Sequence, residues 1–322
     1  MSEASPSVAD SGARFWALLA EQVGRAVVGA EDALRLIAVA LLADGHVLIE
    51  DVPGTGKTLL ARAIARALAL ESGRVQGTPD LLPLDITGSS IYEGNGLRFV
   101  PGPVFTNVLL VDEINRSTPR TQAALLEAMQ ERQVSVEGTT RPLPDPFVVL
   151  ATQNPVEFEG TFPLPQAQLD RFLVRARIGY PTEAQERRIA SRYRAATEPL
   201  EAIEPVADAQ AVQALREAVR QVHVAPELEA YIVSLTRATR DHPDIELAVS
   251  PRATVALYRA AQAEASLAGR QFVTPDDVKR VCPAVLAHRL LVDSERSLHG
   301  VTALSVVEGI IERLPAPPLA ED

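Results

Sequence analysis

The 322-residue sequence has only one cysteine, Cys282. One cysteine excludes an internal disulfide framework and is typical of a reducing compartment. Because no histidine–carboxylate arrangement accompanies Cys282, we expect a small core residue rather than a nucleophile. The longest strongly apolar run, residues 36–43, is too short to span a bilayer, and the first residues lack the basic and apolar regions of a secretory signal. These absences predict a cytoplasmic protein without a transmembrane segment.

Positive charge and aromatic side chains are also scarce. The chain has 31 Lys and Arg against 42 Asp and Glu, a net charge of −11, and 4% aromatic residues. This balance argues against bulk electrostatic binding to nucleic acid or to an anionic membrane, although it does not exclude a local basic groove. Apolar residues make up 47% of the chain, which is typical of a globular protein, and the length favours about two domains.

Short apolar runs alternate with helical patterns in the first half of the chain. Buried strands are predicted at residues 46–50, 107–111, 147–152 and 172–178, and a hairpin near 134–142. Helices are predicted within 14–43 with a break near 27–29, from residue 57 onward, and over 119–131. Strands that alternate with helices favour a parallel sheet. Residues 13–181 are therefore predicted to form an α/β domain, preceded by a disordered tail at 1–12.

The second half of the chain reads differently. Helices are predicted at residues 182–196, 207–222, 226–240, 251–268 and 274–288, and strand signals almost disappear. We therefore expect an all-α domain at 182–322.

The strongest local signal lies between the first predicted strand and its helix. Glycines there let backbone N–H groups approach phosphate oxygens, and the N-terminus of the following helix favours negative charge. In such a loop the lysine reaches the β- and γ-phosphates and the hydroxyl binds Mg²⁺. An acidic residue stands where the pattern G-x-x-x-x-G-K-[ST] has its first glycine. The candidate residues are Asp51, Val52, Pro53, Gly54, Thr55, Gly56, Lys57 and Thr58.

Two further segments place polar groups at predicted strand ends. Asp112 and Glu113 follow a fully apolar strand, where the first carboxylate can hold Mg²⁺ and the second can deprotonate an attacking water. Asn154 follows the strand at 147–152, so its amide could reach the γ-phosphate or that water. Taken alone, Asn154 before Pro155 reads better as a turn residue.

Taken together these motifs resemble the MoxR type of AAA+ ATPase. The shared segments are EDVPGTGKT at 50–58, DEINR at 112–116, ATQNP at 151–155, QLDRF at 168–172 and SPRA at 250–253. The resemblance implies a P-loop α/β nucleotide-binding domain with a parallel sheet, followed by an all-α lid domain. It also implies binding of ATP and Mg²⁺, assembly into rings that are usually hexamers, and an insert near residues 84–103.

The resemblance also implies roles for residues outside the phosphate loop. Asn154 matches the first sensor, and Arg171 matches the arginine finger that one subunit supplies to its neighbour's ATP. The alternatives for Arg171 are a local salt bridge with Asp170 or another nearby acid, or the finger role falling to Arg116 or Arg120. Arg252 matches the second sensor of the lid; its place in the first turn of a helix, where an arginine opposes the helix dipole, suggests that it serves an external anion. Val28 and Gly29 match the segment beside adenine, although simple core packing explains them equally well.

Three functions remain open from the sequence. The first is a ring ATPase that remodels a client protein, such as one with a von Willebrand factor A domain. The second is a nucleic-acid motor, which the few basic residues near the 134–142 hairpin disfavour, so nucleic acid is an unlikely partner. The third is a slow, nucleotide-gated scaffold, which the intact catalytic set argues against.

Overall fold

The computed structural model describes residues 8–51, 54–93, 96–154, 160–192 and 198–318. Helix α1 spans Val8–Ala26, so the expected disordered tail is wrong for residues 8–12, which are helical. Val52 and Pro53 of the candidate phosphate loop lie outside the described residues. No helix in the described ranges is both long and apolar enough to cross a membrane.

A five-stranded parallel sheet organises the first domain. Its order is β2-β5-β8-β1-β9, and the strands are β1 (Val47–Glu50), β2 (Ser72–Gln76), β5 (Val108–Asp112), β8 (Val148–Gln153) and β9 (Val174–Ala176). The structure confirms the four strands expected from apolar runs. The fifth strand, β2, was not predicted, because it is an edge strand in which only Val75 is buried.

Helices cover both faces of this sheet, which explains why β5 is buried at every position. Val108 and Leu110 face a core shared with α1, α2 (Glu31–Leu42) and α3 (Lys57–Ala67). Leu109 and Val111 face a second core built with α5 (Pro119–Glu131). Alternate residues of one strand thus serve two cores, as in other doubly covered parallel sheets.

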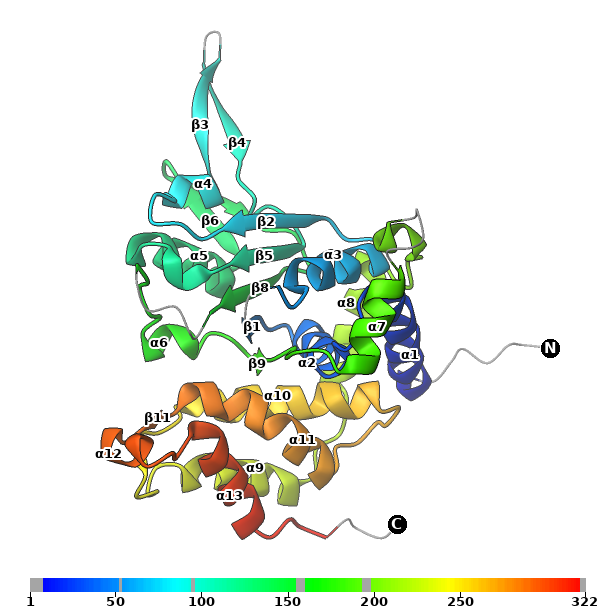
Figure 1. Ribbon diagram of the computed structural model, residues 1–322, viewed down its shortest axis with the longest axis vertical. Coiled ribbons are helices and arrows are strands. Elements are labelled where there is room, and N and C mark those ends of the chain that lie inside the picture. The colour runs from blue at the N-terminus through cyan, green and yellow to red at the C-terminus, as the bar shows by residue number, and fades with distance from the viewer. Residues whose placement is uncertain (1–7, 52–53, 94–95, 155–159, 193–197, 319–322) are drawn as a thin grey trace, which may run out of the picture.

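Two hairpins interrupt the α/β pattern. Helix α4 (Pro83–Thr87) leads into β3 (Gly88–Glu93) and β4 (Gly96–Pro101), an antiparallel pair within the expected insert. Figure 1 shows this β3–β4 hairpin projecting from one end of the long axis of the molecule. The second hairpin, β6 (Gln133–Val136) with β7 (Thr139–Pro142), is the one predicted from sequence.

The remaining chain is mainly helical, as predicted. It contains α7 (Glu183–Arg192), α8 (Ala209–Arg220), α9 (Pro226–Ala238), α10 (Pro251–Leu267), α11 (Pro275–Leu286), α12 (Ser294–Leu298) and α13 (Ala303–Arg313). The exception is a two-stranded sheet of β10 (Ile245–Leu247) and β11 (Leu291–Val292). Short helical segments complete the fold: α6 (Gln166–Leu169), η1 (Ile114–Arg116), η2 (Pro199–Ala202) and η3 (Ala287–Arg289).

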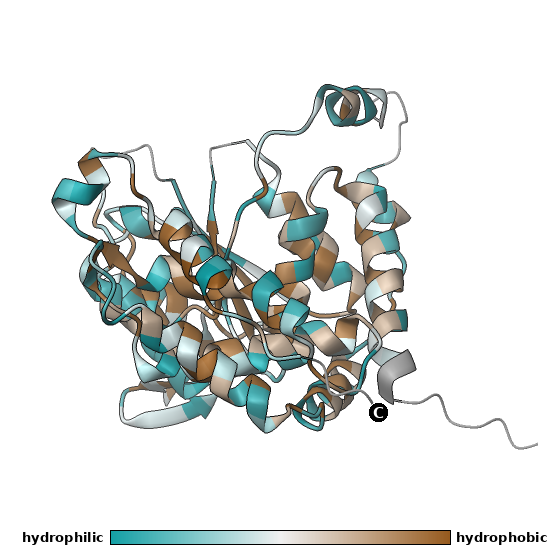
Figure 2. Ribbon diagram, turned by 90° about the horizontal axis from the view of Figure 1, so that it is seen from below, coloured by the Kyte–Doolittle hydropathy of each residue, from teal (hydrophilic) through white to brown (hydrophobic). Residues whose placement is uncertain are grey.

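The helices α9–α13 lie at the end of the molecule opposite the β3–β4 hairpin (Figure 1). Their apolar core is continuous with that of α1, α2 and α3. Figure 2 shows hydrophobic residues along the central strands and on parts of the helices around them. The lid therefore packs beneath the sheet. This position decides which residues it can bring near the candidate phosphate loop.

Candidate active site

The loop after β1 is shaped to receive phosphate. Gly54 and Gly56 have φ angles of 83° and 86°, and, apart from their chain neighbours, no described residue has an atom within 4 Å of the position a Cβ would take on either glycine. Helix α3 begins directly after this loop, so its N-terminus points at the same space. The Lys57 ammonium group donates to the Asp51 carbonyl at 3.1 Å. Burial lowers the pKa of Lys57, while the charges of Asp51, Asp112 and Glu113 oppose that shift.

Asp51, which replaces the expected first glycine, has a structural use. Its carboxylate accepts hydrogen bonds from the backbone N–H groups of Ile178 and Gly179, both at 2.8 Å. It is 8% exposed. Asp51 therefore ties the start of the phosphate loop to the connection between β9 and α7.

Thr58 and Asp112 converge as a magnesium site requires. The Thr58 hydroxyl lies 3.4 Å from Oδ2 of Asp112, at the carboxyl end of β5. Mg²⁺ is commonly held by one or two protein oxygens together with phosphates and water, so this donor set fits the ion. The same Oδ2 accepts from Nε of Arg74 at 2.8 Å.

Glu113 stands beside Asp112 in a left-handed conformation, with φ of 54°. Its carboxylate accepts from Gln76 at 3.2 Å and from the Arg116 guanidinium at 3.1 Å. Its backbone N–H donates to the Thr152 hydroxyl at 2.9 Å. A non-glycine residue in this region stores backbone strain, which is common where a side chain is held for catalysis.

One cavity collects the chemical groups expected to meet the triphosphate. Its lining includes Gly54, Gly56, Lys57, Thr58, Asp112, Glu113 and Asn154. A second cavity shares Gly54, Gly56 and Leu59 with it and is lined by Val27, Val28 and Gly29. Its other walls are largely apolar, with Ile178, Pro181 and Ile189 among them. The structure thus brings Val28 and Gly29 beside the phosphate loop, in a space suited to a flat base.

Arg171 and Arg252 are placed elsewhere. Both line a third cavity of about 340 Å³, whose walls include Asp44 and His46, just before β1. The phosphate loop follows the other end of β1. Since parallel strands all run the same way, the two arginines and the phosphate loop lie at opposite edges of the sheet. The structure does not bring these sequence-predicted residues into one site.

The neighbourhood of Arg171 is held by a buried ion pair. The Asp170 carboxylate accepts from Nε of Arg289 at 2.8 Å and from the Ser250 hydroxyl at 2.9 Å. Ser250 precedes α10, whose first turn carries Arg252. Asp170 therefore fixes the start of α10 next to Arg171. Because Asp170 pairs with Arg289, the alternative salt bridge between Arg171 and Asp170 is not formed.

The rival trans-acting arginines lie away from that cavity. Arg116 contacts its own Glu113, and Arg120 is exposed in the first turn of α5. Neither residue lines the cavity that holds Arg171.

Sequence reasoning missed Arg74 and Gln76, which contact the two adjacent carboxylates. Both lie on β2, whose polar residues gave no strand signal. Their alternation around the buried Val75 was the one available cue. Thr152 was also missed, because a threonine inside an apolar run reads as a strand residue.

Comparison with known proteins agrees with this geometry. Residues 46–174 match the family described as ATPase family associated with various cellular activities (AAA), and residues 237–309 match the AAA lid domain. The chain is 46% identical to the uncharacterized protein YeaC of Bacillus subtilis, over 92% of this chain and 93% of that protein. It is 39% identical to Chaperone MoxR1 of Mycobacterium tuberculosis, over 92% of this chain and 81% of that protein.

A solved structure agrees over nearly the whole chain. The crystal structure of a protein from Cytophaga hutchinsonii, provisionally assigned as an ATPase, superposes with a TM-score of 0.89 at 34% identity, covering 96% of this chain and 97% of that one. The fold, the two family matches and the near-full-length relatives lead to one assignment. The chain belongs to the MoxR family of AAA+ ATPases.

Proposed function

We propose, by resemblance to its family, that this ATPase works as a ring of six identical subunits and that hydrolysis drives the remodelling of a client protein. The observation that carries the proposal is the separation of Arg171 and Arg252 from the phosphate loop. Strand β1 has four residues, so it puts about 13 Å between its two ends. This separation is too large for those arginines to serve the ATP of their own subunit, and it supports a role at the ATP of a neighbour.

Within one subunit, each residue of the phosphate cavity takes a separate task. The loop N–H groups and Lys57 bind the β- and γ-phosphates, and Val28 and Gly29 border the base. Glu113 accepts a proton from the attacking water as the water approaches the γ-phosphorus. Asn154 orients that water or the γ-phosphate.

Thr58 and Asp112 would hold Mg²⁺, which supplies charge neutralisation at the β- and γ-phosphate oxygens. Arg74 pairs with Asp112, so its positive charge would compete with the metal for that carboxylate. Gln76 and Arg116 hold Glu113 in the same way. Binding of ATP and Mg²⁺ would therefore compete with these side-chain contacts.

The trans arginines would complete the site. An arginine supplied to the γ-phosphate stabilises charge in the transition state and can raise the rate by about 10³ to 10⁵. Arg171 takes this role, and Arg252 binds the same triphosphate from α10. Activity then depends on assembly, because no subunit alone holds both halves of the site.

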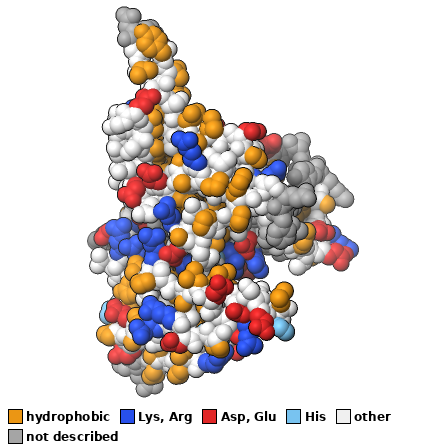
Figure 3. Space-filling model, turned by 90° about the vertical axis from the view of Figure 1, so that its left-hand side faces the viewer, with side chains coloured by type: hydrophobic (Ala, Val, Ile, Leu, Met, Phe, Trp, Pro, Cys, Tyr) orange, Lys and Arg blue, Asp and Glu red, His pale blue; other side chains and the backbone are white. Residues whose placement is uncertain are grey.

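The β3–β4 hairpin is our candidate for the client-binding surface. Ile91, Tyr92 and Leu97 are 43%, 76% and 70% exposed. Figure 3 shows hydrophobic side chains along the projecting end of the molecule that the hairpin forms. Tyr92 and Leu97 are paired across the hairpin and so share one face, and exposed apolar side chains that cluster in this way are typical of protein-binding surfaces. Since Chaperone MoxR1 is a relative, we propose a chaperone-like role, with von Willebrand factor A-domain proteins among the clients to test.

The structure gives no support for a nucleic-acid motor. Arg132, one of the two arginines near the β6–β7 hairpin, pairs with Asp44 at 2.8 Å. The other, Arg141, lies over the Phe99 ring at 4.0 Å. Two arginines engaged within the chain make a poor binding surface for a phosphate backbone.

A subunit-mixing experiment tests the shared site. Glu113→Gln and Arg171→Ala should each be inactive alone, because one lacks the base and the other lacks the finger. At equal amounts, about one quarter of the interfaces in random rings pair an intact Glu113 with an intact Arg171, so activity should return to about that fraction of wild type. Failure to regain any activity, with mixed rings confirmed by size, would refute the shared site.

A further inference from the structure

The cavity that holds Arg171 and Arg252 contains more positive charge than two arginines. Five arginines line it, and only two carboxylates, Asp44 and Asp170, stand against them. The contacts of each arginine show which of them these carboxylates neutralise. The arginines that keep an unpaired charge determine what the cavity can bind.

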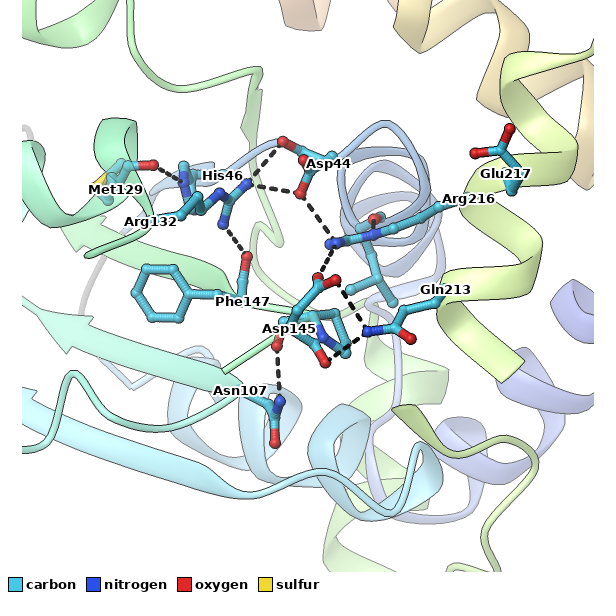
Figure 4. Close-up of polar contacts among 12 residues, drawn as sticks. Asp44, His46, Asn107, Met129, Arg132, Asp145, Phe147, Gln213, Arg216 and Glu217 are labelled. Atoms are coloured by element: carbon cyan, nitrogen blue, oxygen red, sulfur yellow. Dashed lines mark hydrogen bonds and ion pairs between the residues drawn. The ribbon is translucent and has the colours of Figure 1, made fainter. Parts of the chain in front are cut away.

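Arg132 is fully engaged by its own subunit. Its guanidinium donates to the Asp44 carboxylate at 2.8 Å, to the Asp44 carbonyl at 2.9 Å, and to the Phe147 carbonyl. Figure 4 shows these contacts, with Asp44 also bound by Arg216. Burial lowers the pKa of Arg132, and the charge of Asp44 opposes that shift. Arg132 is therefore part of the cavity wall, and its charge is paired with Asp44 inside the subunit.

Arg289 is engaged in the same way. It is 3% exposed, pairs with Asp170, and donates to the carbonyls of Leu173 at 3.1 Å and Phe172 at 2.6 Å. Its charge is thus balanced inside the subunit.

Three arginines are left: Arg171, Arg252 and Arg259. Each lines the cavity, and none has an ion pair with any residue in the described ranges. Arg252 and Arg259 are both exposed and seven residues apart on α10, two turns along one face. At 1.5 Å per residue their backbones lie about 10 Å apart.

Three unbalanced positive charges around one cavity repel each other, so the arrangement is stabilised by an anion with several charges spread along its length. A nucleoside triphosphate has that shape and charge, and the proposed ring brings one to this edge of the sheet. We infer that Arg259 is a third trans-acting residue, which binds the polyphosphate of the neighbouring subunit's nucleotide alongside Arg171 and Arg252. This inference rests on the proposed function and extends it to a residue outside the motifs.

The test adds Arg259→Gln to the mixing experiment, with Arg237→Gln as the matched control. Arg237 is an exposed arginine in the last turn of α9, outside the cavity, so its loss removes the same charge from the lid. Ring size is followed by light scattering, nucleotide affinity by a fluorescent ATP analogue, and turnover by phosphate release.

Arg259→Gln should form rings of wild-type size. Its rings should bind ATP more weakly or turn it over more slowly by about ten- to a hundredfold, the loss expected for one charge-assisted contact to phosphate. Mixing with Glu113→Gln should restore activity, because the added subunits supply an intact Arg259. Arg237→Gln should behave as wild type.

Three results would overturn the inference. Arg259→Gln could match Arg237→Gln, which removes any role in nucleotide binding. It could lose activity without rescue by Glu113→Gln while Arg171→Ala is rescued, which places Arg259 within its own subunit. It could fail to assemble while its lid stays folded by circular dichroism, which assigns Arg259 to a protein contact. Absence of rescue for Arg171→Ala would instead refute the proposed function.

Discussion

Asp170→Ala is the substitution whose cost follows most directly from the structure. It leaves the Arg289 guanidinium buried, with 2% of its side chain exposed and no carboxylate partner. Burial lowers the pKa of Arg289 to about 10 even with Asp170 present. Relative to an ordinary value of 12.5, that shift corresponds to about 3 kcal/mol against the charged form.

Removing one partner of a buried ion pair typically costs about 3–5 kcal/mol, because the other charge is left uncompensated. We expect that loss in the free energy of unfolding for Asp170→Ala, measured in urea at neutral pH by circular dichroism. The double variant Asp170→Ala/Arg289→Met removes both charges and should recover at least half of it. Glu217→Ala, which breaks the exposed pair with Arg220, should cost less than about 1 kcal/mol.

The comparison between the single and double variants decides the argument. If the double variant is as unstable as Asp170→Ala, the stranded charge is not the cause of the loss. If Asp170→Ala costs no more than Glu217→Ala, the pair contributes nothing beyond an exposed one. Either result would refute the reasoning. ATPase activity should also fall in Asp170→Ala, because the hydrogen bond that holds Ser250 beside Arg171 is lost.

Three further predictions concern acid, backbone space and metal. Burial lowers the pKa of His46 to about 3, so the contribution of the neutral ring to the free energy of unfolding is complete above about pH 6.5 and has fallen by about 2 kcal/mol at pH 5. The variant His46→Asn should therefore show a flatter pH dependence of stability in urea, and an unchanged slope would contradict this. A Cβ on Gly77 would lie 2.1 Å from the carbonyl oxygen of Glu113, so Gly77→Ala should displace Glu113 and lower kcat about tenfold or more. The control Gly96→Ala adds a methyl group in open space and should keep the wild-type kcat; equal kcat values for the two variants would exclude the clash. Arg74→Gln removes the ion pair with Asp112, so half-maximal ATP binding should need about two- to fivefold less Mg²⁺. An unchanged or higher Mg²⁺ requirement would contradict the competition between Arg74 and the metal.

The fold was predictable wherever burial dictates sequence. Strands β1, β5 and β8 are covered on both faces, so their residues form continuous apolar runs. Helix α5 begins at a proline after a capping threonine and matches its predicted bounds, Pro119–Glu131. The β3–β4 hairpin and β2 are exposed, so neither leaves such a pattern.

The candidate site was predictable in part for a related reason. The phosphate loop, Asp112 and Glu113 are local motifs at strand ends, and local motifs can be read along the chain. The position of Arg252 depends on where the lid packs, which no local pattern encodes. Only the position of α10 beneath the sheet shows that Arg252 is separated from Lys57 and that Asp170 pairs with Arg289.

Specific ATPase activity as a function of protein concentration is the most direct test of the central claim, that each site is shared between two subunits. With Mg²⁺ and saturating ATP, activity per subunit should be near zero at high dilution and should rise in step with the particle size seen by light scattering. The Glu113→Gln variant should accumulate as ATP-bound rings without turnover. Full activity per subunit from a monodisperse monomer would contradict the account.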